Sequence, residues 1–129
     1  MIQKLTGALL GIIIIGFSTF GAGPSYAGAE KKSVEAVYAE MKQLSGKQVE
    51  VSGKVVKVNN GIMKRNFLHI QDGTGKEGTN DLTITSNQTA EVGEEITVTG
   101  TVVLDTDFGF GYKYPLLVEN SKIQKKAAK

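Results

Sequence analysis

Apolar and polar residues alternate with period two in two segments that share one pattern. The segments are Val49–Val56 and Ile96–Val103, and each has a glycine, Gly53 or Gly100, at its fifth position. Alternation with period two predicts a half-buried β-strand. Two adjacent valines end each segment and point to opposite faces, so the pattern changes phase at the glycine. Because glycine permits a bend or bulge, we expect both strands to bend there, as the strands of a small coiled barrel must.

Before the first of these strands, apolar residues recur at spacings of three and four positions, which predicts an amphipathic helix over residues 34–45. Ser33 is its expected N-cap and Gly46 its expected stop. A single apolar stripe of ordinary width favours a helix that closes one end of a barrel, and docking of a partner is the alternative. The stripe consists of Val34, Val37, Tyr38, Met41 and Leu44.

Runs of alternating residues bounded by turn residues complete the predicted fold. The expected strands are residues 48–59, 67–71, 82–86, 94–104 and 116–123. Turns are expected at Asn59–Gly61 and at Asp72–Gly75, with a loop rich in glycine and aromatic residues at 105–114. Five strands with bends in the first and the fourth predict an all-β fold, a five-stranded OB-fold barrel preceded by one N-terminal amphipathic helix.

The N-terminal 27 residues read as a secretory signal peptide rather than as part of this domain. Lys4 supplies the positive region, Leu5–Phe20 is almost entirely apolar, and Ser25-Tyr26-Ala27 places small residues at a cleavage site. We expect cleavage between Ala27 and Gly28 and a periplasmic or secreted protein, with an uncleaved membrane anchor as the alternative. The OB-fold domain then occupies residues 28–129 and ends in a basic tail.

Charge and cysteine content narrow the function. Lys4 is the one charged residue of the signal segment, so the rest of the chain carries 14 basic and 13 acidic side chains, a net charge of +1. General nucleic-acid binders carry a clear basic excess on one face. Here the lysines are scattered apart from Lys64-Arg65 and the tail Lys122–Lys129, which is expected to be a solvated end. Without cysteine the chain has no disulfide and no thiol nucleophile.

Three segments carry a resemblance to a known family. Residues 49–55, 67–75 and 92–100 resemble OB domains of the anticodon-binding or helicase-associated type. More narrowly, Gly61–Gly75 and Asp107–Tyr112 resemble small secreted bacterial OB-fold proteins, some of which accompany periplasmic respiratory systems, including nitrite reduction. The resemblance covers residues 34–124 and implies a fold more firmly than a function.

The OB fold directs attention to one face as the ligand-binding face. OB barrels bind on the outer face of their second and third strands, flanked by two loops. If Leu68 and Ile70 point inward, alternate residues share the outer face and offer a stacking ring, an imidazole, an amide, hydroxyls and two cations, as single-stranded nucleic acid requires. The alternative is that Phe67 packs under the helix and His69 satisfies a carbonyl. The candidate residues are Lys64, Arg65, Phe67, His69, Gln71, Thr83 and Thr85.

The loop at 105–114 adds three further candidates, Phe108, Phe110 and Tyr112. If the segment is extended, its four alternating aromatic residues fall on one face, either as a stacking ribbon or as a lid over the barrel mouth. A lid is favoured, because a small domain without disulfides needs apolar burial. Asp105 and Asp107 would repel phosphate there, and without a further spaced carboxylate they are a weak calcium site.

We expect no enzyme activity and no cofactor. His69 is the one histidine, and a lone histidine without cysteine is a poor metal site. A single axial haem ligand, with Met63 or a tyrosine opposite, is the remaining alternative. No Ser-His-Asp order and no phosphate loop are visible. The sequence thus predicts a non-enzymatic binding module for an oligonucleotide or other anionic ligand, or alternatively a protein-interaction or maturation accessory of a periplasmic respiratory system of the nitrite-reduction, haem type.

Overall fold

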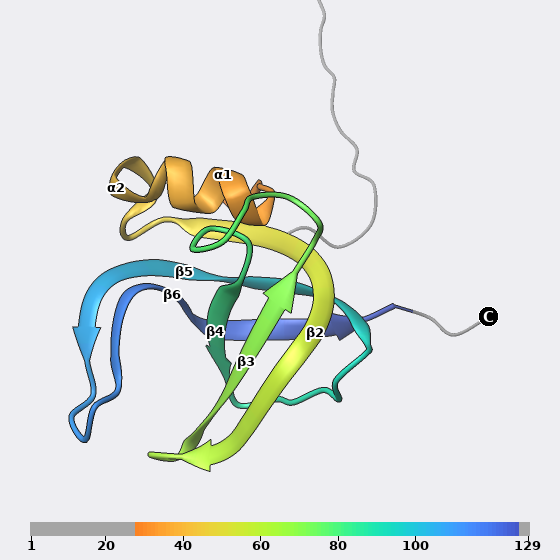
Figure 1. The fold of residues 1–129 in the computed structure, drawn as a ribbon, viewed down its shortest axis with the longest axis vertical. Coiled ribbons are helices and arrows are strands. Elements are labelled where there is room, and N and C mark those ends of the chain that lie inside the picture. The colour runs from red at the N-terminus through yellow and green to blue at the C-terminus, as the bar shows by residue number, and fades with distance from the viewer. Residues whose placement is uncertain (1–27, 127–129) are drawn as a thin grey trace, which may run out of the picture.

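The structure is a computed structural model that describes residues 28–126 (Figure 1). The predicted signal peptide and the end of the basic tail lie outside these residues. The fold is mostly β, as predicted, and no helix in the described part is long and apolar enough to cross a bilayer. The elements are β1 (Glu30–Lys31), α1 (Val34–Ala39), α2 (Met41–Leu44), β2 (Gln48–Ile62), β3 (Arg65–Gln71), β4 (Leu82–Ser86), β5 (Glu95–Asp107) and β6 (Lys113–Lys125).

Five of the strands form a closed ring of hydrogen-bonded neighbours in a mixed, barrel-like sheet. The strand order is β2, β3, β4, β6 and β5, and β5 pairs again with β2. The ring closes because β2 changes its neighbour along its length: its first half pairs with β5 and its second half with β3. Lys54 stands at this crossover and pairs with both Gln71 and Glu95. The sixth strand, β1, pairs in parallel with the start of β2 where only a polar lead was expected.

Both glycines expected at bends lie where a neighbouring strand comes very close. A Cβ on Gly100 would lie 2.8 Å from the Glu119 carbonyl oxygen and 2.5 Å from Ser121 Oγ, and the β5–β6 register shifts at this residue, which confirms the expected bulge. A Cβ on Gly53 would lie 2.8 Å from the Gln71 carbonyl oxygen. Here the buried alternation continues to Val55, and the register shift with β3 comes only after it, so the expected change of phase at Gly53 itself is wrong.

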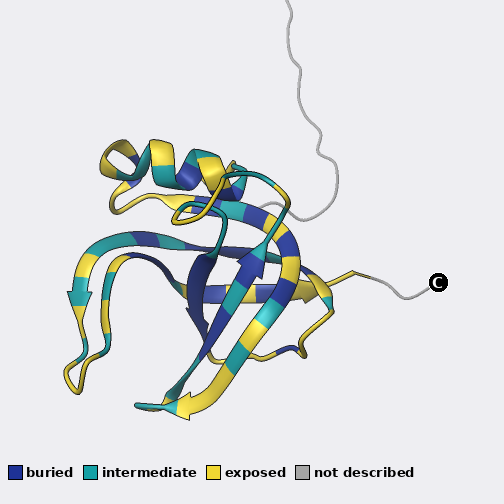
Figure 2. Cartoon of the chain, in the orientation of Figure 1, coloured by how far each residue is buried: buried dark blue, intermediate teal, exposed yellow. Residues whose placement is uncertain are grey.

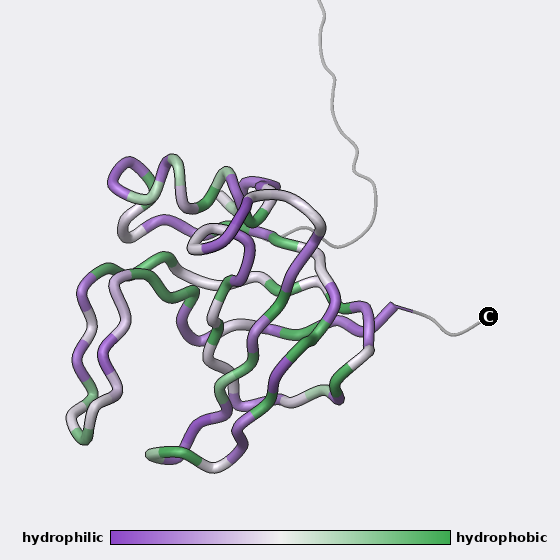
Figure 3. The backbone as a smooth tube through the Cα atoms, in the orientation of Figure 1, coloured by the Kyte–Doolittle hydropathy of each residue, from purple (hydrophilic) through white to green (hydrophobic). Residues whose placement is uncertain are grey.

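The main core fills the inside of the ring, and the helices close one end of it (Figures 2 and 3). Val34, Val37 and Leu44 are 0–3% exposed and belong to this core, so the amphipathic stripe packs where it was predicted to pack. Every second residue of the central strands contributes the rest. These inward residues include Val49, Val51, Val55, Leu68, Ile70, Leu82, Ile84, Val98, Val102 and Val118.

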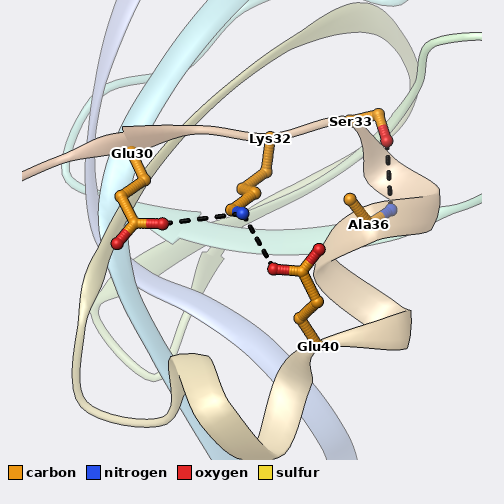
Figure 4. A network of polar contacts seen from close by, with 5 residues as sticks. All are labelled: Glu30, Lys32, Ser33, Ala36 and Glu40. Atoms are coloured by element: carbon orange, nitrogen blue, oxygen red, sulfur yellow. Dashed lines mark hydrogen bonds and ion pairs between the residues drawn. The ribbon is translucent and has the colours of Figure 1, made fainter.

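The predicted single helix is two short helices that meet at Glu40, whose φ of −109° and ψ of 16° leave the helical range. The Glu40 carboxylate accepts a hydrogen bond of 2.8 Å from Lys32, which also lies 3.5 Å from Glu30 (Figure 4). Ser33 is the N-cap as predicted, because its Oγ accepts the N–H of Ala36 at 3.0 Å. The helices are thereby connected to β1 at the edge of the sheet.

Two hairpins extend beyond the ring. The β2–β3 hairpin turns at Met63 and Lys64, whose φ values of 52° and 67° suit a tight hairpin turn, so the turn expected at Asn59–Gly61 is wrong. Strands β5 and β6 continue into the segment expected as a loop, with Thr106 opposite Tyr114 and Asp107 opposite Lys113. We call residues 106–114, which form the end of this second hairpin, the hairpin tip.

Candidate ligand-binding face

Strand register places the candidate residues of β3 and β4 on one face, opposite the main core. Phe67 stands opposite Thr85, and His69 stands opposite Thr83 and Lys57. Directly opposed residues in an antiparallel pair point to the same side of the sheet. The predicted outer face therefore exists as a geometric unit, but it is not open along its whole length.

Phe67 is covered by three aromatic side chains of the hairpin tip, and we call these four residues the aromatic cluster. The Phe67 ring stacks on Tyr114 with centroids 5.6 Å apart and meets Phe108 edge to face at 5.5 Å. Tyr112 lies 6.0 Å from it. As a result Phe67 is 1% exposed, so the expectation that a ligand stacks directly on it does not fit this conformation. The ring packs under the hairpin tip and not under the helix.

Thr83 and Thr85, expected beside an open cleft, are 8% and 1% exposed. The Thr85 hydroxyl accepts a hydrogen bond of 3.1 Å from the Asn120 N–H on β6. Thr85 therefore joins β4 to β6, and both threonines are too deeply buried for a ligand to reach them in this conformation.

Arg65 joins the two hairpins through a cation–π contact. Its guanidinium carbon lies 4.7 Å from the centroid of the Phe108 ring, on the opposite hairpin. A contact of this kind contributes about 0.5–1 kcal/mol at exposed sites. Lys64 is exposed at the turn beside it. Arg65 thus lies against the aromatic cluster, and Lys64 precedes it in the chain.

The four aromatic residues of the β5–β6 hairpin do not share one face, contrary to expectation. Phe108, Tyr112 and Tyr114 turn toward Phe67, whereas Phe110 stands at the end of the turn and is 94% exposed. Left-handed backbone at three consecutive residues, Gly109–Gly111, reverses the chain here. Asp107 supports the turn by accepting the Gly109 N–H at 2.8 Å, which gives this carboxylate a structural partner.

His69 and Gln71 converge on Asp81, a residue that the sequence analysis did not single out. His69 Nδ1 lies 2.7 Å from Asp81 Oδ1, and the Gln71 amide donates to Oδ2 at 3.3 Å. The Asp81 carbonyl accepts the Tyr38 hydroxyl at 2.5 Å, and burial, followed by the Asp81 charge, raises the Tyr38 pKa. His69 is therefore oriented by a carboxylate and not by a carbonyl. The position of Asp81 immediately before the predicted strand at 82–86 was the available signal.

Asp72 belongs to the framework and not to the open face. Its Oδ1 accepts the Thr74 N–H at 3.0 Å, so Asp72 caps its own turn, and its Oδ2 accepts the Val34 N–H at 2.9 Å. Burial raises the pKa of Asp72, but hydrogen bonds from the Thr74 hydroxyl and from these N–H groups outweigh it, so the pKa lies below its ordinary value. The Asp72–Gly75 turn is thus connected to the start of α1.

Within residues 28–126 no three His, Asp or Glu side chains gather closely enough to hold a metal ion. Of the candidate residues, those that remain at least partly accessible are Lys64, Arg65, His69, Gln71, Phe108, Phe110 and Tyr112, and the exposed Asp105 and Asp107 lie on the same hairpin as the last three.

No family model and no curated protein matches this chain. Among the solved structures that match is a protein assigned as an aspartyl-tRNA synthetase from Leishmania major Friedlin, with a TM-score of 0.52 at 13% sequence identity. The match covers 81% of this chain and 22% of that one, so the chain spans about a fifth of that protein's length. At this level of identity the likeness concerns the fold alone. The described residues therefore share a mostly β, barrel-like architecture with one part of a much larger protein.

Proposed function

We propose that this protein is a non-enzymatic OB-fold binding module whose ligand is single-stranded nucleic acid or a similar polyanion. The observation that carries the proposal is the joining of the two hairpins by Arg65 on Phe108, which places a cation against an aromatic surface. Cations that follow phosphates and rings that stack on bases are the two components of single-strand recognition. The solved structure of similar fold is named as an aspartyl-tRNA synthetase, which makes RNA the first ligand to test.

The accessible residues divide into three roles under this proposal. Lys64 and Arg65 contact phosphate, and Tyr112 and Phe110 offer ring surface to bases. His69 and Gln71 present polar groups held in place by Asp81. The family resemblance extends the proposal to a secreted protein, in which the segment 1–27 is removed.

Titration with labelled 12-nucleotide RNA and DNA at several salt concentrations tests the proposal. Each phosphate contact contributes about −0.7 to the slope of log K against log salt for a single strand. We expect Lys64→Gln and Arg65→Gln each to make this slope shallower by about one contact. Lys42→Gln, an equal change on the exposed side of α2, is the matched control and should leave the slope unchanged. No binding at low salt, or equal slopes in all variants, would show the nucleic-acid assignment to be wrong.

A protein partner is the second candidate, as in the respiratory accessory role that the resemblance implies. Two observations favour it. Phe110 is 94% exposed at the hairpin tip, and β5 carries two exposed carboxylates on the way to the tip, Asp105 and Asp107, which would repel phosphate. An apolar protein contact depends weakly on salt. Salt-insensitive binding that is lost in Phe110→Ala would therefore support this candidate over the first.

A further inference from the structure

We propose that Asn60 is a site of spontaneous deamidation and that the fold controls how fast it converts. The sequence pattern predicts a turn at Asn59–Gly61, but the chain turns at Met63 and Lys64 instead. The Asn60-Gly61 pair is therefore free of the structural role that its sequence suggested. Its chemistry does not depend on any ligand, so this inference stands apart from the proposed function.

The reaction joins the Gly61 backbone nitrogen to the Asn60 side chain. Hydroxide removes the proton of the Gly61 N–H, and the nitrogen attacks Cγ of Asn60. The Cγ–Nδ2 bond then breaks, and Nδ2 leaves as ammonia after taking a proton from water. Water opens the resulting succinimide ring at either carbonyl, which gives aspartate or isoaspartate. Both products add a negative charge, and isoaspartate also adds one carbon atom to the main chain of β2. Glycine obstructs the attack least, because it has no Cβ.

A β-bulge holds the pair at an accessible place in β2. The register with β3 shifts between Asn59 and Ile62. Asn60 and Gly61 on β2 therefore stand together opposite one residue of β3, Asn66. Both members of the pair are exposed, and Gly61 has a φ of 74°, a left-handed value that suits glycine. A Cβ at Gly61 would meet nothing within 4 Å, so the space beside its backbone is open to water and hydroxide.

Two hydrogen bonds oppose the reaction, one on each reacting group, and we call them the clasp. The Gly61 N–H donates to Asn66 Oδ1 at 2.9 Å, and this bond is lost when the nitrogen gives up its proton. The Thr89 hydroxyl donates to Asn60 Oδ1 at 2.7 Å. Because Thr89 belongs to the connector between β4 and β5, residues 87–94, it tethers the Asn60 side chain to another segment and restrains the rotation of Cγ toward the nitrogen.

The clasp is connected to the ring of strands through Gln88. Asn66 Nδ2 donates to the Gln88 carbonyl at 3.0 Å, which holds the acceptor of the Gly61 N–H in place. Gln88 is fixed in turn, because its Oε1 accepts the N–H of Ile123 on β6 at 2.8 Å. Asn60 therefore reacts when the bulge and the connector separate, and its rate of conversion reports this local opening.

The strength of the clasp sets the expected rate. One net hydrogen bond changes an equilibrium by about fivefold, so two reduce the reactive population by about 25-fold relative to an unfolded chain. Conversion that required unfolding of the whole domain would be slower by about a thousandfold or more, because folded domains are stable by at least that factor. Local opening is therefore the dominant route.

Incubation of the purified protein at pH 8 in heavy-oxygen water, followed by proteolysis and mass spectrometry, tests the proposal. Heavy oxygen enters only where the ring opens during incubation, which excludes conversion during the digest. A synthetic peptide of residues 57–64 is the unstructured reference. We expect aspartate and isoaspartate at position 60, formed about 25-fold more slowly in the protein than in the peptide. Asn60→Gln should remain unmodified at this position, because the longer side chain closes a ring far more slowly.

Variants of the clasp test its role. Thr89→Val and Asn66→Ala each remove one of the two hydrogen bonds and should accelerate conversion by about fivefold. Thr101→Val, a change of the same kind on β5, is the matched control and should leave the rate unchanged. Far-UV circular dichroism checks that each variant is folded, and Thr89→Val decides the question if Asn66→Ala is not.

Three results would overturn the proposal. Conversion as fast as in the peptide would show that the clasp does not restrain Asn60. Conversion about a thousandfold slower or more would show that only global unfolding exposes the reacting groups. Unchanged or slower conversion in Thr89→Val would show that the hydroxyl does not restrain the side chain, and slower conversion would mean that it assists the attack by stabilising charge on Oδ1.

Discussion

Phe67→Ala should be among the most destabilising single changes in this protein. The ring is 1% exposed and meets three other rings at centroid distances of 5.5–6.0 Å. Truncation of a buried phenylalanine costs about 3–5 kcal/mol through lost transfer energy and the cavity that remains. Because the hairpin tip can settle into part of that cavity, we expect a loss at the lower end, about 3 kcal/mol.

Equilibrium unfolding in urea, followed by far-UV circular dichroism, measures this loss. Phe110→Ala is the matched control. It removes a phenyl ring of the same size, but from a side chain on the hairpin tip that is 94% exposed. Its free energy of unfolding should stay within about 0.5 kcal/mol of wild type. A loss below about 1 kcal/mol for Phe67→Ala, with an unchanged denaturant slope, would refute the packing argument, since the ring would then contribute little to folding.

Two further predictions concern the framework. Gly100→Ala should lower the free energy of unfolding by about 1–3 kcal/mol, because the added Cβ meets the Glu119 carbonyl oxygen at 2.8 Å. Gly53→Ala should have a similar effect, because its Cβ would make a similar contact with a backbone oxygen. Unchanged urea midpoints in both variants would contradict the close approach of the strands. Since the Asp72 pKa is lowered on folding, this carboxylate stabilises the protein above pH 3.8, its ordinary pKa, and the contribution is lost as pH falls through the lower folded value. Asp72→Asn should therefore be less stable than wild type at pH 7, with the difference shrinking toward pH 2; a difference independent of pH would show that charge plays no part.

Local patterns predicted much of the framework. The strand at Leu82–Ser86 agrees with the structure at both ends, and the Ser33 cap is confirmed. Patterns of this kind report backbone preferences and the face to which a side chain points. They located both hairpins but misplaced the first turn: Asn59-Asn60-Gly61 has better turn chemistry than Met63-Lys64, yet the pairing of β2 with β3 continues past it.

The side to which a strand residue points was easier to predict than the side chains that pack over it. Phe67 was correctly assigned to the outer face, but its burial depends on rings that follow it by more than forty positions in the chain. The contact arises from the curvature of β5 and β6, which no periodicity encodes. The partner of His69 was missed for the same reason, because the place of Asp81 before a strand does not by itself show which side chain it contacts.

The double partnership of β2 has a consequence for how the chain folds. The β2–β3 pairing joins residues close in sequence and can form within microseconds as a local hairpin. Closing the ring requires Gln48 to meet Thr101, 53 positions further along the chain, which is the longest separation of any strand pairing in the described residues and carries the largest loop entropy among them. We therefore expect the arrival of β5 at the first half of β2 to limit the rate of folding, and we expect this β protein to fold slowly, as proteins dominated by non-local pairings do. Until that step, the edge of the first half of β2 that later pairs with β5 has no partner strand. We expect this edge to be the part of the folding chain most prone to pair with another copy and aggregate.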